Sequence, residues 1–321
     1  MSIISRFTEI STVLTLLLYF SCGQQATESD NNSVWTQKDF FAIHFSDAKF
    51  GMAVGEDGIL ASTSDGGKKW TLGNINSATQ FYSVFLVDSQ LGFVAGSAGK
   101  IYKTTTGGRS WQESPSGINN FIDAVFFCDQ STGYAVGLLA TILKTTDGGL
   151  SWNSVYSGNI NTEQFYTTWF TDAQTGYVTG ENGFVLRTQD GGGSWQKVGL
   201  SFYGFLLSMY FPTPTTGLVV GWSGTILKTT DGGETWVEKE SGTQNDLYGL
   251  FFADSLNGYC VGALGTVLRT NDAGETWAEI ASGTEENLSS VVLLGRDEGF
   301  ITGLEGVMLK ISVDGISRAV N

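Results

Sequence analysis

The chain has 321 residues, with 17 Lys and Arg against 32 Asp and Glu, so its formal net charge is −15. This acidic balance argues against nucleic acid as a partner, because phosphate binding needs a basic surface. Only 15% of the residues are charged, whereas 41% are hydrophobic and 43 are Gly, which excludes wholesale disorder and favours many short strands joined by tight turns.

Residues 1–21 have the features of a signal peptide. Arg6 gives a positive first region, and the apolar stretch 13–20 is shorter than the roughly 20 residues of a membrane-spanning helix. Ser21 followed by Cys22 resembles the cleavage site of bacterial lipoproteins, although Leu is usual where Tyr19 stands.

The resemblance implies that Cys22 is lipidated and that the polar residues 22–33 form a flexible tether. We therefore expect an exported protein, anchored at the outer membrane or cell surface. Plain secretion or a periplasmic location stays open as the alternative. Any contact with the membrane would be through the lipid alone.

Two further cysteines, Cys128 and Cys260, are 132 residues apart in the sequence. An exported protein could join them in a disulfide. We favour two buried free thiols.

A repeat of about 41 residues decides the fold. The motif Thr-x-Asp-Gly-Gly-x-Ser/Thr-Trp occurs six times, with spacings of 41, 41, 43, 41 and 41 residues between its tryptophans. Such a period fits a four-stranded propeller blade. The motif tryptophans are Trp70, Trp111, Trp152, Trp195, Trp236 and Trp277. First strands are predicted near residues 40, 81, 122, 165, 206, 247 and 288, which makes residues 34–321 an all-β, seven-bladed propeller of four-stranded antiparallel blades.

The last repeat shows three strand signals and then a short tail, whereas residues 34–36 resemble an unpaired fourth strand. We therefore predict that residues 33–37 complete the seventh blade beside residues 306–312, with Trp35 in place of the missing motif Trp. Closure of this kind removes exposed strand edges.

The first strands also share a pattern across the repeats. A column of small residues is expected where the strands crowd at the axis, and both blade faces are apolar, as blade-on-blade packing requires. The small column is Ala42, Ser83, Ala124, Thr167, Ser208, Gly249 and Ser290.

The repeated motif is the Asp-box, and its physics is local. Its carboxylate accepts hydrogen bonds from amides of the turn between third and fourth strands, its glycines allow positive φ, and its Trp packs beside the turn. Because the acid recurs once per blade, and Thr106 replaces it in the second copy, we interpret these residues as structural rather than catalytic. They are Asp65, Asp147, Asp190, Asp231 and Asp272.

Residues 34–313 resemble the photosystem II stability and assembly factor-like propellers, on the strength of the Asp-boxes, the Gly-x-x-x-Gly-x-x-Gly hairpin before each box and the seven units. The photosynthetic members bind assembly intermediates of membrane complexes and are not enzymes. The resemblance implies a non-catalytic binding or assembly role, with an envelope or surface protein as the expected partner.

Sialidases also carry Asp-boxes, so a carbohydrate-active or carbohydrate-binding propeller is the alternative, with a polysaccharide as ligand. Sialidases hold a carboxylate with three arginines. The other arginines of this chain lie in the signal peptide, in an Asp-box turn, at a repeated strand position or in the tail. Only Arg296 is left for such a site, so the three-arginine set is missing. Glycosidases with paired carboxylates are harder to exclude.

Other candidate sites have plain structural interpretations. The single histidine, His44, lies in a bulky inner column without ligand spacing, so neither a metal nor a cofactor is predicted. The basic residues repeated in the third strands are expected to pair with neighbouring acids.

Two features remain as candidate binding sites. Asp123 stands in a column that is otherwise mostly aromatic, so it could hold a polar ligand at the channel mouth. The turns between second and third strands carry apolar residues where polar ones are usual, which often marks a protein interface, with Trp a favoured anchor. These apolar tips are Trp222, Leu138, Leu139, Leu264 and Leu304, and folding under adjacent loops is the alternative for them.

Overall fold

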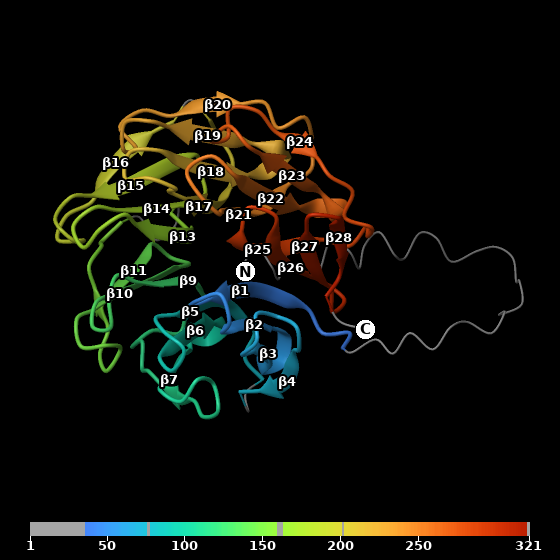
Figure 1. Ribbon diagram of the computed structural model, residues 1–321. Coiled ribbons are helices and arrows are strands. Elements are labelled where there is room, and N and C mark those ends of the chain that lie inside the picture. The colour runs from blue at the N-terminus through green and yellow to red at the C-terminus, as the bar shows by residue number, and fades with distance from the viewer. Residues whose placement is uncertain (1–35, 76–77, 159–162, 201, 320–321) are drawn as a thin grey trace, which may run out of the picture.

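A computed structural model describes residues 36–75, 78–158, 163–200 and 202–319, and these form seven four-stranded sheets around a central axis (Figure 1). Every sheet is antiparallel and follows chain order from its inner to its outer strand. The predicted seven-bladed β-propeller is confirmed.

The four strands of each blade are short, and the blades run in order along the chain. Blades 1 and 2 contain β1 (Phe40–Phe45), β2 (Gly51–Gly55), β3 (Ile59–Thr63), β4 (Thr71–Asn74), β5 (Phe81–Leu86), β6 (Gly92–Gly96), β7 (Ile101–Thr104) and β8 (Gln112–Glu113). Blades 3 and 4 contain β9 (Ile122–Phe127), β10 (Gly133–Gly137), β11 (Thr141–Thr145), β12 (Asn153–Ser154), β13 (Phe165–Phe170), β14 (Gly176–Gly180), β15 (Phe184–Thr188) and β16 (Gln196–Gly199). Blades 5 and 6 contain β17 (Leu206–Tyr210), β18 (Gly217–Gly221), β19 (Ile226–Thr229), β20 (Val237–Lys239), β21 (Leu247–Phe252), β22 (Gly258–Gly262), β23 (Val267–Thr270) and β24 (Ala278–Glu279). Blade 7 contains β25 (Leu288–Gly295), β26 (Glu298–Gly303), β27 (Met308–Ser312) and β28 (Gly315–Arg318). Single 3₁₀ turns follow four of the second strands: η1 (Glu56–Gly58), η2 (Ser97–Gly99), η3 (Trp222–Gly224) and η4 (Ala263–Gly265).

The second strand of each blade lies deepest in the sheet. All five residues of β2, β6, β10, β14, β18 and β22 are buried. A glycine ends each of these strands because the preceding connection passes against it; a Cβ on Gly55 would lie 1.8 Å from the carbonyl oxygen of Asp39. The repeated Gly-x-x-x-Gly pattern thus follows from close backbone approach.

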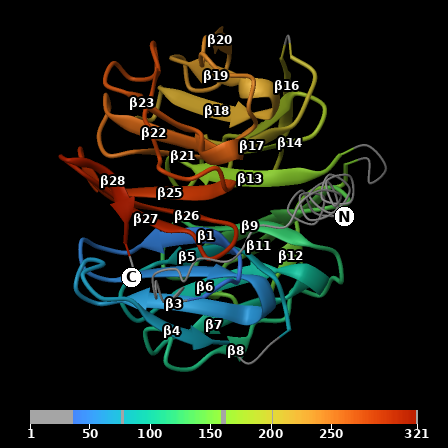
Figure 2. The same cartoon turned by 90° about the vertical axis from the view of Figure 1, so that its right-hand side faces the viewer.

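Adjacent blades pack face to face around the ring (Figure 2), and stacked aromatic rings hold them together. The ring of Phe93 in blade 2 stacks on Phe127 in blade 3, with centroids 3.8 Å apart, and Trp152 of the Asp-box contacts Phe127 edge-on at 5.9 Å. Tyr134 and Phe170 repeat the stack between blades 3 and 4 at 3.9 Å. The hydrophobic core therefore lies between adjacent blades, in agreement with the prediction that both faces of each blade are apolar.

The inner strands crowd at the axis and hydrogen-bond one another. The Ser83 hydroxyl accepts from Val125 N of the next blade (3.1 Å), and His44 Nδ1 accepts from Leu86 N (3.2 Å). A Cβ on Gly249 would lie 3.0 Å from the Ser290 Cα. The predicted column of small residues is confirmed, and the crowding of the inner strands explains it.

The predicted closure of the ring is wrong. β27 pairs along its outer edge with β28, in the register Leu309 to Arg318 through Ser312 to Gly315, so no place remains there for residues 33–37. The sequence contains no clear sign of β28. The turn before it lacks a complete Asp-box, and Ile316 is the one residue of this strand that is not fully exposed. Trp35 lies outside the described residues.

The N-terminal segment closes the ring in another way. A Cβ on Gly306, in the turn of blade 7, would lie 2.1 Å from the carbonyl oxygen of Thr36. The equivalent Gly265 of blade 6 meets Thr284 at 1.9 Å, and Thr284 lies in the ordinary connection to the next blade. Thr36 therefore occupies the place of a blade-to-blade connection, and the Ser289 hydroxyl donates to Phe40 O (2.6 Å) to join the first and last inner strands.

Candidate functional site

One end of the propeller, the loop face, brings together the turns between second and third strands and the starts of the inner strands. The register of β1 on β2, with Phe40 opposite Gly55, puts the beginning of each inner strand beside such a turn. The Asp-box turns lie at the other end of the blades. The loop face therefore contains both candidate binding features from the sequence.

Every inner strand begins with a β-bulge. In β9, Ile122 lies opposite Gly137 and Ala124 opposite Val136, which leaves Asp123 as the extra residue. Bulges redirect side chains, and here they form a ring at the mouth of the central channel. The seven bulged residues, called the bulge ring below, are Phe41, Tyr82, Asp123, Tyr166, Leu207, Tyr248 and Ser289.

Asp123 is the acidic member of the bulge ring, and its neighbours in ring order are Tyr82 and Tyr166. It is half-buried, and its Oδ2 is shielded from solvent with no hydrogen-bond partner among the described residues. Burial raises the pKa of Asp123 to about 8. Near neutral pH this carboxyl group is therefore mostly protonated, and a positively charged group beside it would favour release of the proton and formation of an ion pair.

The apolar tips divide into two kinds. The second residue of each turn takes positive φ, between 50° and 65°, and six of these seven residues are exposed, whereas the first residue tucks toward the ring. Leu139 and Leu264 are second residues and are 43% and 67% exposed. The predicted exposure is thus present at these two positions.

Leu138, Trp222 and Leu304 are first residues, and they are not exposed tips as predicted. Leu138 is 7% exposed and packs on Tyr166, while Trp222 and Leu304 are half-buried. The indole of Trp222 lies 3.8 Å from the Phe205 ring and leaves its Nε1 without a partner in the described residues. The alternative of folding under adjacent groups holds for Leu138, because its side chain is buried against Tyr166.

Two aromatic residues of this face, Phe121 and Phe205, were not predicted from the sequence to be part of the site. Each stands just before an inner strand, where other blades carry a polar residue that can cap a turn amide. Asp246 accepts from Ser223 N (2.8 Å) and Asn287 accepts from Leu264 N (3.0 Å) in this way. The signal that could have revealed the aromatic pair is their departure from this repeated polar position.

The Asp-boxes lie on the opposite face and hold their own turns. Asp147 Oδ1 accepts from the Thr145 hydroxyl (2.8 Å) and from Ser151 N (2.9 Å). These bonds lower the pKa of Asp147 to about 2, first through the Ser151 side chain. In the second box, the Thr106 hydroxyl accepts from Ser110 N (3.0 Å) and so replaces the carboxylate without its charge. The geometry is that of structural turns.

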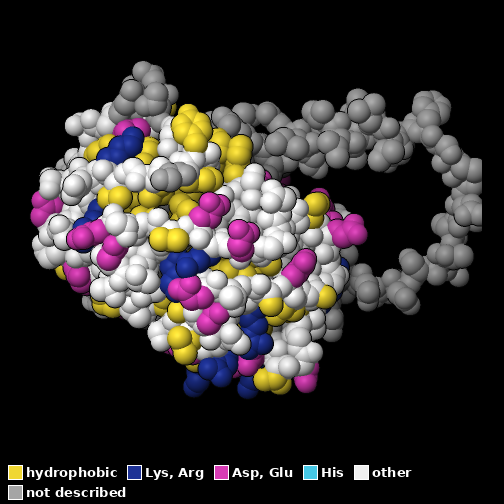
Figure 3. Space-filling model, turned by 90° about the horizontal axis from the view of Figure 1, so that it is seen from above, with side chains coloured by type: hydrophobic (Ala, Val, Ile, Leu, Met, Phe, Trp, Pro, Cys, Tyr) yellow, Lys and Arg dark blue, Asp and Glu magenta, His cyan; other side chains and the backbone are white. Residues whose placement is uncertain are grey.

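The remaining sequence candidates fall outside this site. Cys128 and Cys260 are free thiols, and Cys22 lies outside the described residues. In the part of the chain that the structure describes, no group of His, Cys, Asp and Glu could hold a metal ion, and no helix there is long and apolar enough to cross a membrane. Acidic side chains are scattered over the visible side of the molecule (Figure 3).

Comparison with known proteins places this geometry in a family. The family model described as photosynthesis system II assembly factor YCF48 matches residues 24–118, 116–203, 194–258 and 243–312. No curated protein sequence matches the chain significantly.

Three solved structures illustrate the range of similar folds. A structure of YCF48 bound to a D1 peptide has a TM-score of 0.74 at 21% identity, covering 87% of this chain and 95% of that one. YCF48 from Cyanidioschyzon merolae has a TM-score of 0.72 at 19% identity, with 87% and 97% covered. A GH74 xyloglucanase from Xanthomonas campestris has a TM-score of 0.66 at 12% identity, and this chain, 86% of which is covered, matches only 52% of it. With Asp-boxes in their structural place, seven closed blades and a family model matched over most of its length, the chain belongs to the photosynthesis system II assembly factor YCF48 family.

Proposed function

We propose that this protein is a non-catalytic binding protein of the cell envelope whose loop face takes up a segment of a protein partner. The observation that carries the proposal is the bulge ring, where the shielded Asp123 carboxylate lies among aromatic residues. The family supports an assembly role, and a similar fold is known with a peptide bound.

The chemistry of the loop face specifies the segment. A Lys or Arg side chain would pair with the Asp123 carboxylate and contact the rings of Tyr82 and Tyr166, an arrangement that stabilises a cation through both charge and π-electrons. The apolar surface of Leu139, Leu264 and the Trp222–Phe205 pair would cover hydrophobic residues beside it. The expected segment is therefore basic at one position and apolar around it.

Export and lipidation at Cys22 are part of the same proposal. A lipid on Cys22 would hold the propeller at a membrane through residues 22–33, which leaves the propeller itself free to meet an envelope partner. Radioactive palmitate should label the native protein and fail to label Cys22→Ala. A labelled Cys22→Ala variant would exclude this anchor.

Site-specific photo-crosslinking in cells tests the loop face. A photoreactive residue at Leu264, 67% exposed on the loop face, should give a defined protein adduct. The matched control is Leu150, which is 74% exposed but lies in an Asp-box turn on the opposite face, and it should give none.

Two variants sharpen this experiment. Asp123→Asn and Trp222→Ala should each reduce the Leu264 adduct at least fivefold, because the first removes the acidic group that would pair with the cation and the second removes the indole stacked on Phe205. Equal adducts from Leu150 and Leu264, or adducts that both variants leave unchanged, would exclude the loop face as the binding site.

The carbohydrate alternative has weaker support. The xyloglucanase resembles this chain only in fold, and this chain spans about half of its length. Each of the described Asp-box carboxylates is engaged in its own turn, as Asp147 and Asp231 show. Cleavage of a polysaccharide by the purified protein would overturn the non-catalytic proposal.

A further inference from the structure

A second surface, on the Asp-box face, differs from the rest of the propeller. Six of the seven third strands carry a basic residue at the same position, one residue before the strand's Thr or its equivalent, whereas blade 1 has Ser62. The basic residues are Lys103, Lys144, Arg187, Lys228, Arg269 and Lys310.

Five of these six basic side chains bond across the seam to the next blade. Lys103 Nζ donates to Gly148 O of the next Asp-box (2.7 Å), and Lys144 Nζ donates to Gly191 O (2.6 Å). Lys228, only 5% exposed, reaches Glu275 of the next blade at 2.7 Å. A long cation at this position therefore occupies the space between adjacent blades and bonds across it.

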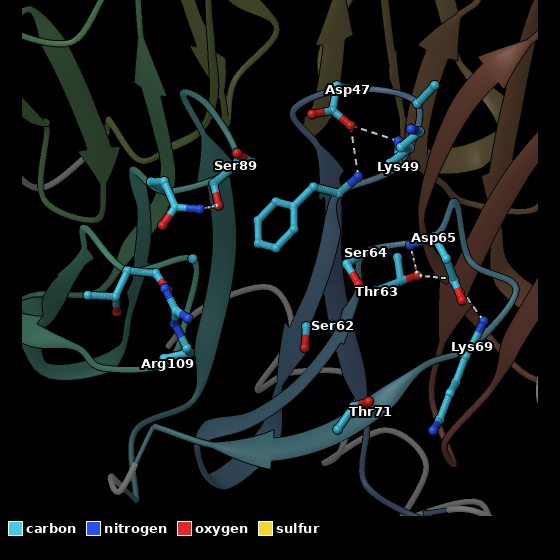
Figure 4. A pocket seen from close by; sticks show the side chains of 15 residues that line it. Asp47, Lys49, Ser62, Thr63, Ser64, Asp65, Lys69, Thr71, Ser89 and Arg109 are labelled. Carbon is cyan, nitrogen blue, oxygen red and sulfur yellow. Dashed lines mark hydrogen bonds between the residues drawn. The ribbon is translucent and has the colours of Figure 1, made fainter.

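Ser62 is too short to cross its seam, and a groove of about 810 Å³ lies between blades 1 and 2 (Figure 4). Its walls come from the β1–β2 turn, the end of β3, the start of β4 and the second Asp-box. Gly107, which corresponds to Gly148 in the next box, lines the groove and receives no side-chain hydrogen bond from blade 1 among the described residues.

A second exception to the repeat lines the same groove. Thr106 stands where the other complete boxes have Asp, and it keeps the turn closed with a neutral hydroxyl. The two departures, Ser62 and Thr106, belong to successive repeats and are brought together across one seam. One removes the side chain that fills the seam, and the other removes a negative charge from its wall.

Three cations surround the groove, with Arg109 on one side and Lys49 and Lys69 on the other (Figure 4). None of the three forms an ion pair within the described parts of the chain. The nearby acids are engaged in their turns: Asp47 Oδ1 accepts from Lys49 N (2.7 Å), and Asp65 Oδ1 accepts from Lys69 N (3.0 Å). The lining thus has three positive and two negative side chains, and in a protein of net charge −15 its excess positive charge favours an anion.

Hydroxyl groups line the space between these cations. Ser62, Ser64 and Thr71 face the groove beside the aromatic ring of Phe50. Hydroxyls both donate and accept hydrogen bonds, and so match the hydroxyls of a sugar, while an aromatic ring offers a flat apolar surface to a sugar ring. An acidic peptide would also pair with the cations and the hydroxyls, but its backbone would not offer a sugar ring to the face of Phe50.

We propose that the groove between blades 1 and 2 binds an acidic oligosaccharide built of uronic acids. Its carboxylates pair with Arg109, Lys49 and Lys69, its hydroxyls exchange hydrogen bonds with Ser62, Ser64 and Thr71, and one ring lies on Phe50. The groove is on the opposite face from the bulge ring, so this binding is independent of the proposed protein partner.

The test is calorimetric titration of the full chain with hexagalacturonate at low salt. We expect saturable binding that weakens at least tenfold in Arg109→Ala and remains unchanged in Arg318→Ala, an exposed arginine on β28. A neutral hexasaccharide of glucose should bind at least tenfold more weakly.

Two variants that introduce the residue found at the same position in other repeats provide the sharpest control, because Lys and Asp are accommodated there in the other blades. Ser62→Lys should fill the seam and abolish binding with no loss of thermal stability, and Thr106→Asp should weaken binding at least fivefold. Absence of hexagalacturonate binding, or binding that Ser62→Lys leaves unchanged, would overturn the proposal. Tighter binding of hexaglutamate than of hexagalacturonate would overturn it in favour of an acidic peptide.

Discussion

The carboxylate of Asp39 accepts a hydrogen bond from the backbone amide of Glu305 at 2.9 Å, although 266 residues separate them in the chain. Asp246 and Asn287 make the same contact to the turns of blades 5 and 6 between residues that are 23 apart. The ends of the propeller are therefore joined by the contact that elsewhere joins one blade to the next.

Asp39→Ala should lower the free energy of unfolding by about 1 kcal/mol, because the Glu305 amide loses its acceptor. Asp246→Ala removes the equivalent bond inside the ring and is the matched control. Urea denaturation measures both variants. Hydrogen exchange should show faster opening of β1 and β25 in Asp39→Ala only, because the Asp39 contact lies at the seam between the chain ends. Equal exchange in the two variants would contradict a special role for this seam.

Truncation after Ser312 should destabilise the protein by at least about 2 kcal/mol, because it removes β28 from the edge of β27 and exposes the cluster on which Ile316 packs. Thermal unfolding measures the loss. Val313→Ser, at an exposed position of the same hairpin, should leave the melting temperature unchanged. A truncated protein as stable as the full chain would show that another strand closes blade 7.

His44 should make the protein acid-sensitive. Burial lowers its pKa to about 4, below the ordinary value of 6.5, so the unfolded chain takes up a proton that the folded chain refuses. The resulting stability is complete above pH 6.5 and is lost as the pH falls toward 4, by at most about 1.4 kcal/mol per pH unit.

His44→Phe should flatten this loss, since Phe fills the same column in blades 2 and 3, at the cost of the acceptor for Leu86 N. Denaturation midpoints between pH 4 and 7 provide the measurement. An unchanged pH profile in the variant would mean that another group carries the acid sensitivity.

Asp123 should have the opposite effect in a higher pH range. Burial raises its pKa to about 8 from the ordinary 3.8, so the folded state holds a proton that the unfolded state releases. Stability should therefore fall as the pH rises from about 4 to 8, and above pH 6.5 His44 no longer adds to the pH dependence. Asp123→Asn should abolish the slope between pH 6.5 and 8. A slope that persists in the variant would show that the Asp123 carboxylate is already ionised there.

Much of the candidate site could be predicted from the repeat alone. The column of Phe41, Tyr82 and Asp123 is visible when the units are aligned, because every unit has the same strand period. The bulge that turns this column into the channel mouth was not predicted, since a bulge depends on how two strands pair rather than on the residues of one strand. The exposure of Leu139 likewise depends on the positive φ of its turn, and the burial of Leu138 depends on its packing against Tyr166 of the next blade.

By itself the sequence determined the seven-bladed architecture, because hydrophobic alternation and the Asp-box are local signals repeated at a constant spacing. Only the tertiary structure decided how the ring closes, since β28 and Thr36 find their places through partners far away in the chain. It also brought Ser62 and Thr106 together in one groove. Each of these two residues is a small exception within its own repeat, and their shared location follows from the packing of adjacent blades.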